Sequence, residues 1–302
     1  MGSELRTGLL AALAAYLLWG TLPLYFRALG HIQPDEMLAH RILWSVPTGL
    51  AMVALARSWT TLRALITLRQ LAWLGLSASL IGLNWMIYIW AVSVERVAEA
   101  SLGYYINPLV SVLLGRLMFS ERLRLAQWVS VAIAGIGVVV LTLVLGYLPW
   151  VALALCFSFA FYGAIRKKIG VDGRAGFVVE AVILAPLAAL WLGHLVGSGQ
   201  TGLMGEGGWD PLLLIASGPI TAIPLICFTV AARRLQFSTI GMMQYLAPTL
   251  QFLIAVLVFG EPFTHAHAVA FGFIWLALII FTTDSLVGTA RARRLARAAQ
   301  LT

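Results

Sequence analysis

Residues 104–121 read YYINPLVSVLLGRLMFSE, and residues 244–261 read QYLAPTLQFLIAVLVFGE. Both stretches hold a Tyr, a Pro, a Phe and a Glu at matching places, and each matching pair is 140 residues apart. Shorter similarities accompany them: Leu18-Trp19-Gly20 matches Phe161-Tyr162-Gly163, and Pro47 has a counterpart in Pro186. The pattern predicts that the chain contains one structural unit twice.

The composition is that of a membrane protein. Of the 302 residues 61% are hydrophobic and only 11% are charged, and the mean hydropathy is +0.93. A soluble domain carries roughly 25% charged residues, and so few charges would not cover the surface of a soluble fold. An ordinary cytosolic enzyme, a disordered chain and a small secreted scaffold are therefore excluded. The two cysteines, Cys156 and Cys227, lie in apolar runs and imply no disulfide framework.

Ten apolar runs have about the length that a helix needs to cross ~30 Å of hydrocarbon. We expect spans at residues 7–27, 36–56, 70–92, 97–118, 125–145, 148–166, 175–197, 211–232, 236–259 and 266–287. The predicted fold class is an all-α, polytopic membrane protein with ten transmembrane helices in two inverted five-helix repeats. The first repeat is placed at residues 1–146 and the second, with a basic C-terminal tail, at residues 147–302.

The positive charges predict the orientation of these spans, because short cytoplasmic loops carry an excess of Lys and Arg. With the N-terminus inside, the six cytoplasmic segments hold 17 of the 20 Lys and Arg residues, and the opposite side keeps Arg27 and Arg96. We therefore expect both termini in the cytoplasm. The net charge of +8 then reflects topology, and the basic C-terminal tail either helps to set that topology or lies against anionic lipid. No nucleic-acid partner is expected.

An odd number of spans in each copy means that the second copy enters the membrane upside down. The glutamates agree with this, since Glu121 ends its span inside and Glu261 ends its span outside. Inverted repeats are typical of secondary transporters, in which they give two pseudo-equivalent conformations around a site near the midplane. A duplicated channel or scaffold without alternating access is the alternative interpretation.

Several short motifs allow a comparison with known families. They are Trp19-Gly20, the Pro–Phe–Glu pattern of the fourth and ninth spans, Asp35-Glu36, His40-Arg41, Asn84-Trp85, the run from Glu99 to Tyr104, and Arg166-Lys167-Lys168. In their order and spacing they resemble the EamA family of the drug/metabolite transporter superfamily, and within it the RarD type. The resemblance covers nearly the whole chain. It implies ten helices, two inverted five-helix bundles and export of small metabolites or drugs from a bacterial cytoplasm.

Aromatic amino-acid exporters of the YddG type are similar too. Their fourth-span pattern of Glu, Tyr and Pro matches Glu99, Tyr105 and Pro108. They carry a Trp where this chain has Asn107, and this departure argues against strict aromatic specificity. RarD-type proteins are labelled chloramphenicol-sensitivity permeases, which does not define a natural substrate.

Arg41 is the most costly residue to place in a membrane. It lies five or six residues inside the second span, ~8 Å below the outer interface, and an intramembrane Arg is penalised by ~2.5–3.5 kcal/mol even on insertion scales. It could snorkel outward or pair with Glu99, it could hold a substrate carboxylate, or it could gate the outer mouth. A direct bridge to Glu180, its counterpart in the other repeat, is not expected, because ~15 Å of depth separates them.

Five residues are candidates for gating or coupling: His40, Glu99, Glu180, Pro108 and Pro248. Desolvation favours the protonated form of a carboxyl, so Glu99 or Glu180 could carry a coupling proton. The alternative is that each pairs with basic neighbours near a helix end. His40 could titrate or could be packed and hydrogen-bonded. Each proline removes a backbone hydrogen bond in mid-span, which produces a kink or a free carbonyl ligand.

Polar and aromatic side chains near mid-depth predict the lining of a solute cavity. An amide in hydrocarbon needs partners and therefore faces the bundle interior, and aromatic rings with polar tips suit an amphipathic solute. The candidate substrate-binding residues are Arg41, Trp19, Asn84, Trp85, Tyr88, Tyr104, Tyr105, Asn107, Gln244 and Tyr245. For any single residue, helix packing is the alternative role.

The sequence contains no cluster with metal-ligand spacing and no nucleotide-binding motif, so we expect no cofactor, no metal and no enzymatic activity. The predicted function is that of a secondary transporter that exports small metabolites across the bacterial inner membrane by alternating access. Amino acids, aromatic or otherwise hydrophobic ones among them, are the expected solutes, and a monomer is expected to suffice. A multidrug exporter of the same fold is the first alternative, followed by a passive channel and a polytopic membrane enzyme.

Overall fold

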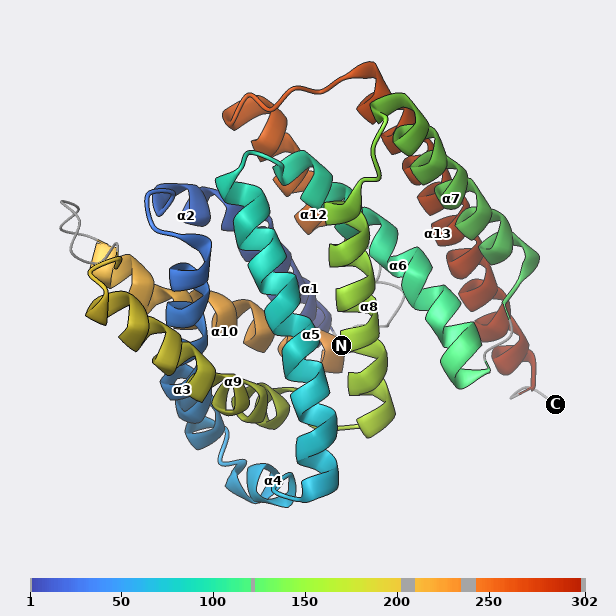
Figure 1. The fold of residues 1–302 in the computed structure, drawn as a ribbon. Helices are drawn as coiled ribbons and strands as arrows, with labels where there is room; N and C mark the ends of the chain where they lie inside the picture. Colours follow the sequence, from blue (N-terminus) through green and yellow to red (C-terminus); the bar gives the residue numbers. More distant parts are fainter. Residues whose placement is uncertain (1, 121–122, 202–209, 235–242, 300–302) are drawn as a thin grey trace.

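The computed structural model describes residues 2–120, 123–201, 210–234 and 243–299 (Figure 1). These residues form helices and connecting turns, and the described part of the chain contains no strand. Eight helices are long and apolar enough to cross a membrane, and two shorter apolar helices accompany them. The prediction of an all-α, polytopic membrane protein is confirmed. The count of ten spans is compatible with this arrangement.

The helices follow the predicted spans closely. In chain order they are α1 (Gly2–Gly20), α2 (Leu22–Ala28), α3 (Pro34–Leu55), α4 (Trp59–Ala64), α5 (Leu68–Ser93), α6 (Val97–Phe119), α7 (Leu125–Leu145), α8 (Trp150–Ile169), α9 (Gly173–Gly197), α10 (Asp210–Arg234), α12 (Leu246–Leu253), the π-helix η2 (Ile254–Val258) and α13 (His265–Ala299).

Two departures from regular spans have local causes. The first span divides at Thr21 into α1 and α2, where Pro23 stands in the first turn of α2 and the Thr21 hydroxyl donates to the carbonyls of Leu17 and Leu18. The ninth span is α-helical over α12 and widens into η2. Residues 236–242 of the predicted ninth span lie outside the described residues.

The helices pack in pairs that respect the predicted repeat. α1 contacts α10 and α12, α3 contacts α9 and α10, α5 contacts α8 and α9, α6 contacts α8 and α12, and α7 contacts α13. In the predicted repeat each of the first five spans has a counterpart among the last five. When every helix is replaced by its counterpart, the same set of helix contacts is obtained. The contact pattern is thus compatible with two interlocked copies of one unit, and the domain boundaries remain a prediction.

Two glycines allow helices to approach at backbone distance. A Cβ on Gly218 of α10 would lie 2.2 Å from the carbonyl oxygen of Trp44 in α3, and one on Gly103 of α6 would lie 2.5 Å from the carbonyl oxygen of Ala152 in α8. Small residues serve this purpose in membrane proteins, where dispersion contacts replace the hydrophobic effect between helices.

Gly218→Ala is therefore expected to lower the free energy of unfolding by about 1–3 kcal/mol, because α3 and α10 must move apart to admit the methyl group. Gly193→Ala in α9 is the matched control, since its Cβ would meet nothing within 4 Å. There the better helix propensity of Ala stabilises by up to ~1 kcal/mol. Thermal unfolding in detergent compares the two variants. Equal midpoints for Gly218→Ala and Gly193→Ala would contradict the close approach of α3 and α10.

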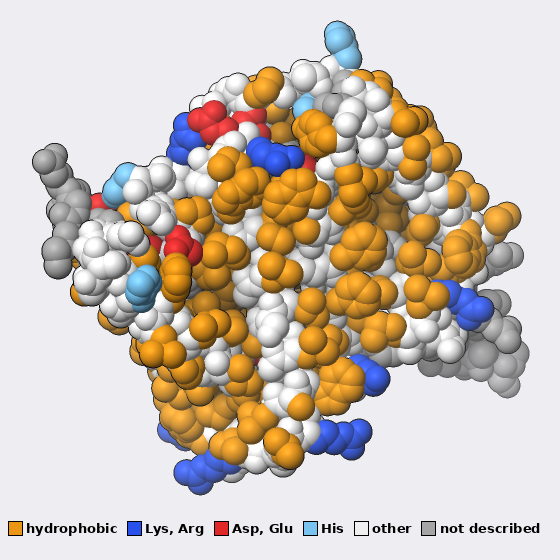
Figure 2. All heavy atoms as spheres, in the orientation of Figure 1, with side chains coloured by type: hydrophobic (Ala, Val, Ile, Leu, Met, Phe, Trp, Pro, Cys, Tyr) orange, Lys and Arg blue, Asp and Glu red, His pale blue; other side chains and the backbone are white. Residues whose placement is uncertain are grey.

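The surface carries a broad apolar face between two polar ends. Figure 2 shows hydrophobic side chains over the middle of the molecule, basic side chains toward the lower edge, and acidic and basic side chains together at the top. Leu190 and Leu257 are each 74% exposed, which suits contact with lipid. We call one end the Arg96 end and the other the Arg166 end. The Arg96 end comprises residues 27–34, 93–97, 146–150, 198–201 and 259–264, and the Arg166 end comprises residues 55–68, 119–120, 123–125, 166–174 and 234.

Candidate solute site and its neighbouring charges

Arg41 lies inside the bundle, eight residues into α3, and only 5% of its surface is exposed. Its Nε–H donates to the Thr221 hydroxyl of α10 at 2.9 Å. The close approach of α3 and α10 at Gly218, one turn from Thr221, makes this contact possible. Within the described residues the two Nη groups make no hydrogen bond, so most of the donor capacity of the guanidinium remains free.

Aromatic rings surround the guanidinium. The Arg41 Cζ lies 4.3 Å from the ring centroid of Trp85 and 5.6 Å from that of Phe26. Phe26 packs against Tyr88, and Tyr88 packs against Tyr104 at 5.7 Å between centroids. Together these side chains form what we call the Arg41 cage: Arg41, Phe26, Trp85, Tyr88, Tyr104 and Thr221. Cation–π contacts of this kind stabilise a desolvated guanidinium without neutralising its charge.

The two tyrosine hydroxyl groups of the cage differ in their hydrogen bonding. The Tyr104 hydroxyl donates to Asn84 Oδ1 at 3.2 Å, while Asn84 Nδ2 donates to the Leu155 carbonyl and the Ser158 hydroxyl of α8. The Tyr88 hydroxyl is fully buried and has no hydrogen-bond partner. A buried hydroxyl without a partner costs free energy, so Tyr88 is a donor that lacks an acceptor.

No described acid neutralises Arg41. All ten acidic residues of the described part bond elsewhere: Glu4 to Arg234, Asp35 to Trp191, Glu36 to Thr201, Glu95 to Arg27, Glu99 to Arg96, Asp172 to Arg174, Glu180 to Arg166, Asp210 to His31, Glu261 to two backbone amides, and Asp284 to Arg124.

Glu99, one of the possible partners of Arg41 in the sequence, has other partners in the structure. Glu99 lies in the first turn of α6 and pairs with Arg96, the residue before that helix. Its other oxygen accepts from the Val151 amide at the start of α8 at 3.1 Å. The carboxylate therefore serves two helix N-termini, where the helix dipole favours a negative charge. Arg41 lies two helical turns inside α3 and is excluded from this contact.

Glu261 ties the loop after η2 to α6. Its two carboxylate oxygens accept from the amides of Val97 and Ala98 at 2.7 and 2.8 Å. Burial raises the pKa of the Glu261 carboxyl above its usual range, although the two amides and Arg27 oppose this shift. At the Arg96 end, Glu99 and Glu261 thus fix the starts of α8 and α6.

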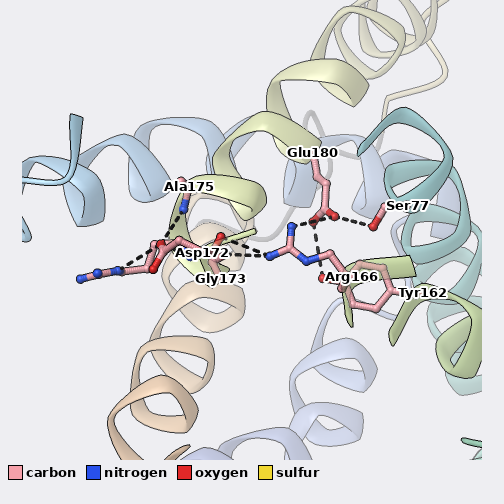
Figure 3. Close-up of polar contacts among 8 residues, drawn as sticks. Ser77, Tyr162, Arg166, Asp172, Gly173, Ala175 and Glu180 are labelled. Atoms are coloured by element: carbon pink, nitrogen blue, oxygen red, sulfur yellow. Dashed lines mark hydrogen bonds and ion pairs between the residues drawn. The ribbon is translucent and has the colours of Figure 1, made fainter. Parts of the chain in front are cut away.

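Glu180 forms a second buried polar cluster toward the Arg166 end, which we call the Glu180 cluster: Ser77, Tyr162, Arg166 and Glu180. Figure 3 shows the Glu180 carboxylate between Ser77, Tyr162 and the Arg166 guanidinium. The Ser77 hydroxyl donates at 2.6 Å, and the Arg166 Nη1 lies 3.3 Å away. The other Nη of Arg166 donates to the carbonyls of Asp172 and Gly173. The cluster joins α5, α8 and the start of α9.

Asp172 caps α9 beside this cluster. Its carboxylate accepts from the amides of Arg174 and Ala175. Burial alone would raise the pKa of Asp172, but these amides and the Arg174 charge hold it below its ordinary value. The start of α9 is therefore anchored on both sides, by its N-cap and by Arg166.

The comparisons with known proteins agree with this architecture. Residues 6–143 match the EamA-like transporter family. The chain is 45% identical to the protein RarD of Escherichia coli over 94% of this chain and 96% of that one, and 45% identical to an uncharacterized transporter of Vibrio cholerae over 96% and 97%. This chain belongs to the EamA family. It is a RarD-type member of the drug/metabolite transporter superfamily and a membrane transporter.

Two further relatives of this EamA protein extend the comparison. It is 36% identical to the chloramphenicol-sensitive protein RarD of Pseudomonas aeruginosa, over 92% of this chain and 94% of that one. A protein of known crystal structure is 26% identical, with a TM-score of 0.58, over 91% of this chain and 96% of that chain. The shared fold thus extends over nearly the full length.

The predicted binding residues of the EamA protein separate into groups. Arg41, Asn84, Trp85, Tyr88 and Tyr104 lie together in or beside the Arg41 cage. A second group lies on the other side of α6, where Tyr105 stacks on Tyr245 and bonds to Thr249. The remaining three are dispersed: Trp19 packs against Tyr16 and Phe228, Asn107 is buried with no partner for its Oδ1, and Gln244 is half-buried in the turn before α12.

The predicted gating residues also have different surroundings. Pro108 lies inside the continuous helix α6, as expected. Pro248 does not stand in mid-helix: it is the third residue of α12, where a helix has no backbone hydrogen bond to lose. His40 is buried and its Nε2 has no partner.

Sequence reasoning missed the residues that complete each cluster in the EamA protein. Phe26 and Thr221 complete the Arg41 cage, and Ser77, Tyr162 and Arg166 complete the Glu180 cluster. Phe, Ser and Thr are ordinary in membrane helices, so their types carried no signal. The one available signal was the intramembrane charge itself, which requires compensation in its neighbourhood.

Proposed function

We propose that this protein is a secondary transporter that exports small carboxylate-bearing metabolites across the bacterial inner membrane by alternating access. One observation carries the proposal: Arg41 is a buried cation with free donors and without an acidic partner among the described residues. An intramembrane charge of this kind belongs to a substrate pathway by default. A bidentate guanidinium matches the geometry of a carboxylate, and the aromatic rings of the cage suit an apolar body.

The transport cycle draws support from the arrangement around the cage. The Arg41 cage lies toward the Arg96 end, and the Glu180 cluster occupies the equivalent place toward the Arg166 end. Arg41 and Glu180 are each the eighth residue of their helix, α3 and α9, which contact one another. We assign the Glu180 cluster the role of a closure, because it joins three helices that must separate to open that end.

Exchange kinetics test the proposal. Proteoliposomes are loaded with a labelled panel of amino acids, other carboxylates and chloramphenicol, and efflux is measured with and without unlabelled solute outside. A carrier accelerates under exchange, whereas a passive channel does not. Movement of carboxylates supports the proposal. Movement of chloramphenicol alone would favour the multidrug alternative, which the aromatic walls of the cage and the name of the Pseudomonas relative support.

The proposed orientation places both termini and the Arg166 end in the cytoplasm. A cysteine at Ser198, at the end of α9, is then expected to react with an impermeant maleimide in intact cells. A cysteine at Ser58, between α3 and α4, is the control for the opposite side and should react only after lysis. The reverse labelling pattern would contradict the orientation.

A further inference from the structure

The Arg41 cage offers hydrogen-bond donors and one positive charge. The two Nη groups of Arg41 and the hydroxyl of Tyr88 have no partners within the described part of the chain. A carboxylate presents two oxygens that accept such bonds, so one bound carboxylate would satisfy the guanidinium and the phenol together.

The charge balance of the cage depends on what else the solute carries. A monoanion brings the buried site to neutrality, while a zwitterion adds as much positive as negative charge and leaves the excess of Arg41 in place. An uncompensated intramembrane charge costs ~2.5–3.5 kcal/mol even on insertion scales.

We infer that the Arg41 cage takes net-anionic monocarboxylates with an aromatic or other apolar body, and discriminates against zwitterionic amino acids of the same shape. The inference rests on the proposed function and narrows its substrate class. Phe26, Trp85, Tyr88 and Tyr104 supply the apolar contact, and Arg41 with Tyr88 supplies the carboxylate contact. Each turnover then moves one negative charge across the membrane.

A matched pair of solutes tests the inference. L-3-phenyllactate and L-phenylalanine share ring, carboxylate and shape, and differ in a hydroxyl against an ammonium group. Proteoliposomes containing the full chain are loaded with either labelled compound. Phenyllactate is expected to leave at least ~10-fold faster, a ratio that corresponds to ~1.4 kcal/mol of discrimination. An inside-negative potential of ~100 mV, set with potassium and valinomycin, should drive phenyllactate outward toward a ratio of about 50-fold.

The possible results of this assay distinguish failure of the anion preference from failure of the proposed carboxylate transport. Equal or faster movement of phenylalanine, or phenyllactate efflux that ignores the potential, overturns the anion inference and leaves carboxylate transport standing. Movement of neither compound, with exchange of chloramphenicol, overturns both.

Variants of cage residues test whether the preference for phenyllactate arises from the Arg41 cage. Tyr88→Phe removes one donor and should raise the half-saturation concentration for phenyllactate ~10-fold without changing the folded yield. Arg41→Lys keeps the positive charge but loses the two parallel N–H donors of the guanidinium. Phenyllactate transport should therefore weaken, while its dependence on the membrane potential persists. Arg63→Gln, an exposed arginine in α4, is the matched control and should behave as wild type. Wild-type phenyllactate kinetics in both cage variants would overturn the inference.

Discussion

Arg41→Met is expected to lower carboxylate transport about 100-fold while raising the thermal midpoint of the protein. The loss of transport corresponds to two charge-assisted hydrogen bonds of roughly 1.5 kcal/mol each. The gain in stability follows because the variant removes a buried charge that no described acid compensates and replaces it with an apolar chain of similar length. Efflux assays and thermal unfolding in detergent measure the two effects on one preparation.

The opposite result for stability would indicate a structural partner for Arg41. A lower thermal midpoint would mean that Arg41 holds α3 to its neighbours, as a buried ion pair does. Arg96→Met is the contrasting control, since Arg96 has a carboxylate partner in Glu99. Full carboxylate transport by well-folded Arg41→Met protein would end the binding role proposed for this residue.

Glu180→Gln is expected to destabilise the protein by about 3–5 kcal/mol, because it leaves Arg166 buried without its counter-charge. Both side chains are shielded: 4% of the Glu180 side chain and 14% of the Arg166 side chain are exposed. Adding Arg166→Gln should recover much of the loss, since the double variant leaves no charge unpaired. Thermal unfolding of the four proteins of this cycle yields the coupling energy.

An exposed pair provides the control for this cycle. Arg27 and Glu95 lie 2.6 Å apart, with 43% and 55% of their side chains exposed. Glu95→Gln should cost no more than ~1 kcal/mol, as exposed pairs do. If Glu180→Gln proved as mild as Glu95→Gln, the Glu180 cluster would not hold α5, α8 and α9 together.

The helical segments were predictable because the cost of placing polar groups in hydrocarbon depends on local composition. Helices α3, α6 and α9 begin within two residues of the expected spans. The division at Thr21 and the π-helix at Ile254–Val258 were not anticipated. The second is instructive, because the corresponding part of α6 has the same spacing between Pro and Phe and remains α-helical. Whether this segment forms an α-helix or a π-helix therefore depends on its tertiary packing.

The candidate site was predictable in part. The cost of an intramembrane charge singled out Arg41 and Glu180 from sequence alone. Their partners were not accessible, because a partner depends on the rotation of each helix about its axis. Glu99 was one possible partner of Arg41 from the sequence, yet it contacts Arg96 and the start of α8. Thr221 lies 180 residues from Arg41, and nothing in its surroundings in the sequence marks it.

The bond between Glu261 and the start of α6 has a mechanical consequence. The two carboxylate oxygens of Glu261 each accept from one of two consecutive amides. Two bonds at neighbouring points resist both sliding and rotation of α6 against the loop after η2. The loop after η2 and the first turn of α6 therefore travel as one rigid piece. Since α6 also rests on α8 through Gly103, that piece includes the start of α8. Phe26, Arg41 and Thr221 lie on other elements, α2, α3 and α10, and Arg27 of α2 rests on Phe259 of that piece. We therefore expect motion at the Arg96 end to carry α2 with the piece and to shift α3 and α10 against it.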